Sequence, residues 1–242
     1  ASYKATILAS LAFGVKVRWA DVYREGIEKI TVEDIQFASE LGYVIKLLVI
    51  GKKNKDGLEL RVHPTLLPLD HPLATVRGVY NAVYVHAEQT GDLLFYGRGA
   101  GMMPTASAVM SDVIEIAQDM TKGLDSVKSD HSMIPTAKRI LPIGDMVSKY
   151  YLRFQVADKP GVLGAIAKIL GENQISILSV HQKEFHGASA PLNAQRSSAD
   201  RRSVPVVILT YEAKESHVHQ ALKKIDIRPD VREKTQVIRV EG

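Results

Sequence analysis

The chain has 242 residues, of which 45% are hydrophobic and 24% charged, and it contains no cysteine. That composition is typical of a globular protein in a reducing cytoplasm; it excludes a disulfide scaffold and a thiolate metal site, and no apolar stretch is long enough for a membrane span. The net charge of +4 does not indicate nucleic-acid binding, because the basic residues are scattered among acids and their densest cluster, around Arg201, has no interleaved aromatics.

The N-terminal third predicts two helices. Ala1–Phe13 places Tyr3, Ile7 and Leu11 on one helical face and ends at Gly14. A second helix is expected to begin after Thr31, which suits an N-cap with Asp34 three residues on, and to end at Gly42.

Strands are expected next. Their hydrophobic patterns alternate or are β-branched, and composition assigns turns or loops between them. We predict strands at Val44–Ile50, Leu58–Val62, Val76–Ala87 and Asp92–Tyr96, a turn at Gly51–Gly57 and an ordered loop at His63–Pro72.

A glycine-rich turn, Gly97–Met103, leads into a predicted helix at Pro104–Met120. Thr121–Val147 has no clear period, and we interpret it as a linker that packs back on the first domain. Val76–Ala87 is apolar on both of its faces, so a partner subunit is expected to cover one of them.

From Tyr150 onward the pattern predicts a ferredoxin-like βαββαβ unit. Its first strand, Tyr150–Val156, alternates with polar residues and is expected to be half-buried. The loop Glu184–Ser203 is unusually long for a hairpin. The remaining elements are a helix at Val162–Leu170, strands at Ile175–Lys183 and Val204–Tyr211, a helix at Lys214–Ile225 and a strand at Lys234–Val240.

Two features could carry chemistry. Lys4, near a helix start, is either solvated or a general acid, a role open to a lysine whose ammonium pKa is lowered by burial. The glycines of Gly97–Gly101 either shape a tight turn or let backbone N–H groups approach a ligand. No complete dinucleotide-binding unit is present, because G-x-G-x-x-G would need glycine where Met102 stands. The histidine spacing predicts no metal site.

Three segments in order resemble the catalytic region of homoserine dehydrogenase: KATILASLAF from Lys4, GIEKITVEDIQFASELG from Gly26, and YGRGAGMMPTASAVMSD from Tyr96. The resemblance implies NAD(P)-dependent interconversion of L-homoserine and L-aspartate 4-semialdehyde in threonine, methionine and isoleucine biosynthesis. It implies that Lys4 is the catalytic proton donor and that Gly99, Ala100 and Gly101 abut the nicotinamide. It also implies that NAD(P) is held mainly by an N-terminal domain missing from this chain, which alone would be inactive.

The C-terminal unit resembles an ACT domain, the amino-acid-sensing βαββαβ module. Its ligand turn is matched by Asp158, Pro160, Gly161, Val162 and Leu163, and Asn173 also fits the pattern. In this family such a domain implies feedback control by threonine and pairing of subunits into a homodimer or higher oligomer.

The expected fold is therefore α+β: a mixed-sheet catalytic and dimerisation domain with helices on one face, followed by a ferredoxin-like ACT domain. The expected boundaries are 1–120 for the catalytic domain, 121–148 for the linker and 149–242 for the ACT domain. The alternative function is a non-catalytic amino-acid-binding module for regulation or dimerisation, in which the first domain is only a scaffold.

Overall fold

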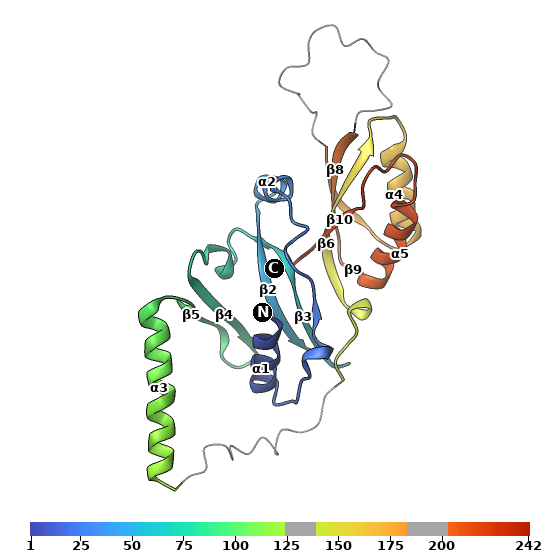
Figure 1. The fold of residues 1–242 in the computed structure, drawn as a ribbon. Helices are drawn as coiled ribbons and strands as arrows, with labels where there is room; N and C mark the ends of the chain where they lie inside the picture. The colour runs from blue at the N-terminus through green and yellow to red at the C-terminus, as the bar shows by residue number, and fades with distance from the viewer. Residues whose placement is uncertain (124–138, 183–202) are drawn as a thin grey trace.

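The computed structural model describes residues 1–123, 139–182 and 203–242, and it has the expected α+β fold class (Figure 1). We call residues 1–123 the N-terminal unit and residues 147–242 the βαββαβ unit. The helices are α1 (Ser2–Phe13), α2 (Val32–Glu40), α3 (Met102–Thr121), α4 (Val162–Glu172) and α5 (Glu215–Ile225), with 3-10 turns η1 (Trp19–Asp21), η2 (Pro72–Thr75) and η5 (Ile143–Asp145). The strands are β1 (Tyr23–Arg24), β2 (Tyr43–Lys53), β3 (Leu58–Pro68), β4 (Tyr80–Ala87), β5 (Gly91–Arg98), β6 (Val147–Ala157), β7 (Ile177–Gln182), β8 (Ser203–Thr210), β9 (Ala213–Lys214) and β10 (Gln236–Val240).

One sheet runs through both units. Hydrogen-bonded strands follow the path β1–β3–β10–β6–β8–β7. Strands β1 and β10 pair with successive parts of one edge of β3, and β2 pairs with its other edge. The last strand, β10, pairs antiparallel with β6 and parallel with β3, where Arg239 is opposite Thr65 and Val240 opposite Leu66. The order β10–β6–β8–β7 is that of a ferredoxin-like unit, whose edge strand here also completes the sheet of the N-terminal unit.

Helices cover the two faces of this sheet in different places. Helices α1 and α2 lie on the same face of β3, because the even-numbered β3 side chains pack against both of them. Helix α2 extends this cover over the βαββαβ strands, where Phe37 and Ala38 contact the cluster that contains Tyr151. Helices α4 and α5 cover the opposite face of those strands.

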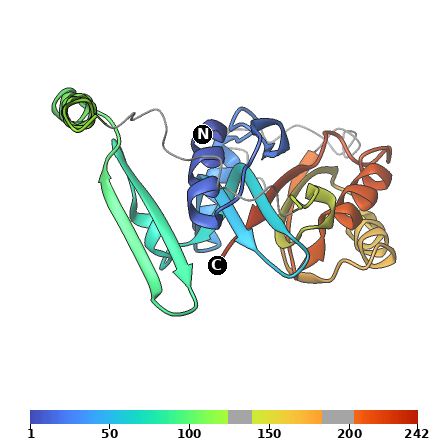
Figure 2. The same cartoon turned by 90° about the horizontal axis from the view of Figure 1, so that it is seen from below.

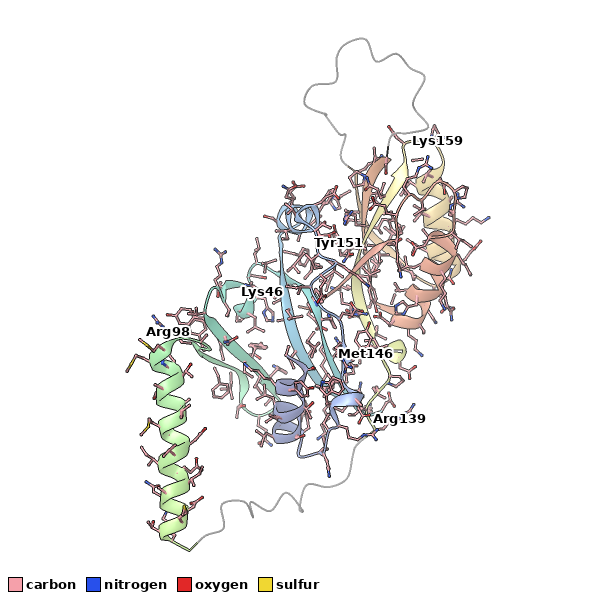
Figure 3. The ribbon with its side chains drawn as sticks, viewed as in Figure 1. Lys46, Arg98, Arg139, Met146, Tyr151 and Lys159 are labelled. Carbon is pink, nitrogen blue, oxygen red and sulfur yellow. The ribbon has the colours of Figure 1, made fainter. Side chains whose placement is uncertain are left out.

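Strand β6 is therefore buried on both faces, and the prediction of a half-buried strand is wrong. Its apolar residues Leu152 and Phe154 face α4 and α5, whereas Tyr151 and Arg153 lie beneath α2. Figure 3 shows Tyr151 between the two units. Apolar and polar residues do alternate along β6, but its polar face is covered by α2 of the N-terminal unit and not by water.

The predicted loop at His63–Pro72 is also wrong over its first half, because β3 continues to Pro68. The Val62 oxygen accepts from Glu25 N and the Leu66 oxygen from Glu241 N, so alternate β3 residues direct their backbone groups to the edge shared by β1 and β10. Pro64 lies between Val62 and Leu66, and its nitrogen points to the same edge of β3. No strand pairs with that edge at this position, because the pairing with β1 ends before it and the pairing with β10 begins after it. A proline, which has no N–H, is tolerated there.

Strands β4 and β5 form a separate two-stranded sheet, and Figure 2 shows this hairpin and α3 standing away from the main sheet. Strand β4 begins at Tyr80 and not at Val76, because η2 and the turn at Gly78 (φ 62°) precede it. Helix α3 begins two residues before the predicted start and has no buried residue.

The linker and the long hairpin loop lie largely outside the described residues, which omit 124–138 and 183–202. The described end of the linker lies against β3, where Leu58 N donates to Arg139 O and Leu141 N to Leu58 O.

The predicted N-cap at Thr31 is confirmed as a full capping box with Asp34. Asp34 is completely buried and also binds the βαββαβ unit: Arg153 Nε donates to its Oδ1 over 2.6 Å, and the Tyr151 hydroxyl donates to the same oxygen over 3.1 Å. Burial opposes ionisation, but Arg153 and Thr31 together hold the pKa of Asp34 below its usual value. The ion pair therefore stabilises the fold at neutral pH, and its contribution is lost as the pH falls through that lowered pKa.

Replacing Asp34 with alanine should destabilise the chain by about 3–5 kcal/mol, because Arg153 stays buried and loses the carboxylate that is buried with it, keeping only the partly exposed Glu33. The matched control is Glu33→Ala on the same helix: Glu33 lies 3.0 Å from Arg153 but its side chain is 34% exposed, so a loss below about 1 kcal/mol is expected. Urea unfolding of both variants measures the difference. Equal losses would show that burial of the Asp34 pair is unimportant.

Candidate functional site

Lys4 lies on the exposed side of α1. The helix packs on β3 through Ala5 and Ala9, so the Tyr3, Ile7 and Leu11 face that identified the helix is not its core face. Those three side chains are 68%, 62% and 73% exposed, and Leu8 is also exposed. Lys4 is exposed among them, because positions 7, 8 and 11 follow it at i+3, i+4 and i+7.

Local backbone geometry accounts for two glycines of the turn between β5 and α3. Gly99 N donates to Val79 O over 2.9 Å, and a Cβ on Gly99 would lie 1.3 Å from Asn81 Nδ2. Gly101 is the N-cap of α3 with a φ of 126°, a conformation that favours glycine. The first N–H groups of α3 follow at once, and the turn is exposed.

The structure does not bring Lys4 and the glycine turn together. Figures 1 and 2 agree that α1 lies on the main sheet while the turn lies at the far end of the β4–β5 hairpin. In Figure 3 Arg98, the last residue of β5, is beside the start of α3 and away from α1. Among the described residues no group of three histidine or acidic side chains could hold a metal ion.

The predicted ligand turn of the βαββαβ unit opens α4. Gly161 is the N-cap with a φ of 89°, Val162 is buried and Leu163 is 37% exposed. Asn173 lies at the other end of this 11-residue helix, about 18 Å from Gly161. Its amide nitrogen donates to Ile169 O and its oxygen accepts from Lys224, so it joins α4 to α5.

A buried polar cluster that the sequence analysis missed lies where the units meet. Arg239 on β10 is 2% exposed and donates to both oxygens of Glu215 on α5, through Nε over 2.8 Å and Nη2 over 2.5 Å. Its Nη2 also donates to Glu25 Oε1 over 3.0 Å, after β1. The Tyr150 hydroxyl donates to Glu215, whose carboxylate is 1% exposed. An arginine within the apolar strand QVIRV was the one signal that could have revealed it.

His63 on β3 belongs to the same region and is fully buried. Its Nδ1 lies 2.9 Å from Pro64 O and donates to it, and its Nε2 has no hydrogen-bond partner among the described residues. Burial, aided by the nearby Arg239 charge, lowers the pKa of His63 to about 4.

Comparison with known proteins identifies both regions. Residues 1–114 match the family model described as homoserine dehydrogenase, and residues 150–191 match the ACT domain. The whole chain is 40% identical to the homoserine dehydrogenase of Neisseria gonorrhoeae and 39% identical to that of Pseudomonas aeruginosa. It covers 53% and 54% of those proteins, so it spans about half the length of the curated relatives it matches.

Solved structures agree. The crystal structure of a homoserine dehydrogenase from Thiobacillus denitrificans superposes with a TM-score of 0.82 at 37% identity, over all of this chain and 52% of that one. A Staphylococcus aureus homoserine dehydrogenase at pH 7.5 gives a TM-score of 0.62 at 27% identity, with the same coverage. Both resemblances drawn from the sequence are confirmed.

His63 should give the fold a specific pH dependence. Its folded-state pKa of about 4 lies below the unfolded value of about 6.5, so the unfolded chain binds the extra proton between these values and stability falls as the pH falls. The part due to His63 is about 2 kcal/mol between pH 7 and pH 5. Urea unfolding should show a pH difference smaller by that amount in His63→Gln. The control His217→Gln removes a histidine outside the cluster and should keep the wild-type difference; an unchanged difference in His63→Gln would contradict the assignment.

Proposed function

Because the chain is homoserine dehydrogenase-like along its whole length and carries an ACT domain, we propose that the protein containing it interconverts L-homoserine and L-aspartate 4-semialdehyde with NAD(P). The observation that supports this proposal most strongly is the similarity of the entire chain, at about 40% identity, to homoserine dehydrogenases. The reaction belongs to the biosynthesis of threonine, methionine and isoleucine. A chain without cysteine fits a cytoplasmic enzyme, and no helix among the described residues could cross a membrane.

Lys4 is the proposed general acid. A bound nicotinamide would supply the hydride to the aldehyde carbon, and the Lys4 ammonium would give a proton to the oxygen as it becomes a hydroxyl. The apolar side chains around Lys4 support this role, because their burial by another part of the protein would place the ammonium in a dry, low-dielectric site. In that environment a lysine is a better proton donor than in water.

The turn formed by Gly99, Ala100 and Gly101 is proposed to abut the nicotinamide. It is exposed and carries only a methyl side chain, so a flat ring could approach its backbone closely. We propose that most of the NAD(P) is held by the part of the relatives that this chain does not span, and the 242-residue chain alone is then inactive.

Substitution of Lys4 by alanine in the intact enzyme should lower kcat by about two to four powers of ten, the usual size of general acid–base catalysis. The Michaelis constant for homoserine should change much less. The control Lys53→Ala removes another exposed lysine, at the end of β2, and should leave kcat unchanged. Steady-state assays with NAD⁺ and NADP⁺ measure both; a kcat within threefold of wild type would remove Lys4 from the mechanism.

Threonine is the proposed effector of the ACT domain, bound near Asp158, Pro160, Gly161, Val162 and Leu163. The turn opens α4, whose first N–H groups are unpaired within the helix and attract a carboxylate. Asn173 is proposed to support this site from the other end of α4, through its contact with α5.

Calorimetry should show threonine binding to this chain at millimolar concentration or below. Gly161→Leu should abolish it, because a side chain is strained at a φ of 89° and blocks the turn. The control Gly164→Leu adds the same side chain within α4, where nothing lies within 4 Å of the new Cβ. Isoleucine and methionine are titrated in parallel. If none of the three amino acids binds, the sensing hypothesis is contradicted.

A second copy of the chain is proposed to cover the β4–β5 hairpin. This two-stranded sheet is apolar and exposed, with Val83, Leu94, Phe95 and Tyr96 all at least 40% accessible. Light scattering at micromolar concentration should give at least a dimer, and Phe95→Asp should shift it towards monomer because a charge cannot be buried there unpaired. A monomeric mass for the unmodified chain is the contrary result.

A further inference from the structure

The only tryptophan of the chain, Trp19, is 38% exposed and contacts residues of both α1 and β1. The Trp19 ring stacks on Tyr3 of α1, with ring centroids 5.5 Å apart and planes 12° from parallel. The Arg24 guanidinium covers the ring at 3.9 Å from the centroid. The indole Nε1 donates to Ser2 Oγ over 3.0 Å. The ring thus contacts both residues that immediately precede Lys4.

The other side of this stack is fixed to the sheet. Arg24 belongs to β1, which pairs with β3 at Val62. Trp19 begins η1, which Arg18 and Asp21 brace with two hydrogen bonds of 2.9 and 2.7 Å. The stack therefore links the first turn of α1 to the central strand β3.

The rest of α1 is held mainly along its middle and at its far end. Ala5 and Ala9 are its buried residues, Phe13 packs against the same cluster, and Ser10 Oγ accepts from Val17 N over 3.4 Å. The stacked indole and its directed N–H act instead on the first turn, next to Lys4.

We propose that Trp19 is a positioning residue for Lys4, held between Tyr3 and Arg24 so that its hydrogen bond to Ser2 fixes the first turn of α1. This inference rests on the proposed role of Lys4 as the proton donor. Displacing a donor by about 1 Å can cost about a hundredfold in rate, so the stack would control the proton-transfer step without touching substrate.

The test is a double-mutant cycle in the full-length protein that carries this sequence. Trp19→Ala should lower kcat for homoserine oxidation by about ten- to a hundredfold, with the Michaelis constant changed less than about threefold. Trp19→Phe keeps a ring between Tyr3 and Arg24 but removes the hydrogen bond to Ser2, so it should recover only part of the lost rate. In a Lys4→Ala background, Trp19→Ala should have almost no further effect, because the two residues act on one step. The control Tyr211→Ala removes another exposed aromatic ring, in the βαββαβ unit, and should leave kcat within threefold.

The outcomes separate this inference from the proposed function. If Lys4→Ala is slow but Trp19→Ala keeps a wild-type kcat, only the inference about Trp19 fails. The same holds if the two losses simply multiply, since Trp19 would then act elsewhere. If Lys4→Ala itself keeps a wild-type kcat, the proposed function of Lys4 fails and the Trp19 inference with it. Melting curves show whether Trp19→Ala is folded; if it is not, the Trp19→Phe arm of the cycle decides by the same criteria.

Discussion

Arg239 is buried in the strand that the two units share, and the rest of the architecture depends on how its charge is balanced. A buried guanidinium is tolerated only where carboxylates face it. Glu215 comes from α5 of the ACT domain, and Glu25 follows β1 of the N-terminal unit. Because the charge needs both, β10 stays between β6 and β3, and the sheet is continuous. The Asp34–Arg153 pair makes a second such link beneath α2.

This continuity gives the proposed regulation a physical route. An effector at the start of α4 would act on a domain whose neighbouring helix α5 carries Glu215, and Glu215 contacts Arg239 directly. The β1 strand, which ends at Arg24, lies on the same side of β3 as β10 and carries the support for Trp19. The proposed ligand site at the start of α4 and the first turn of α1 are thereby connected through one sheet.

Local rules predicted the elements that depend on local interactions. The capping box at Thr31 and Asp34, the helix end at Gly14 and the βαββαβ order follow from spacing, and they are confirmed. What failed depended on distant residues. Pro64 is tolerated within β3 only because β1 ends and β10 begins beside it, and the polar face of β6 is buried only because α2 covers it. The sequence suggested Lys4 and the glycine turn, but the pattern could not reveal that they lie apart in this chain or that Trp19 braces α1.

Scanning calorimetry of the 242-residue chain tests most directly whether the shared strand and its buried charges make the two units one structure. The account predicts a single unfolding transition whose calorimetric and van't Hoff enthalpies agree. In Arg239→Met, which removes the shared charge, that transition should split or move to lower temperature. Two independent transitions in the unmodified chain would contradict the account, because they would mean that the ACT domain folds without the N-terminal unit.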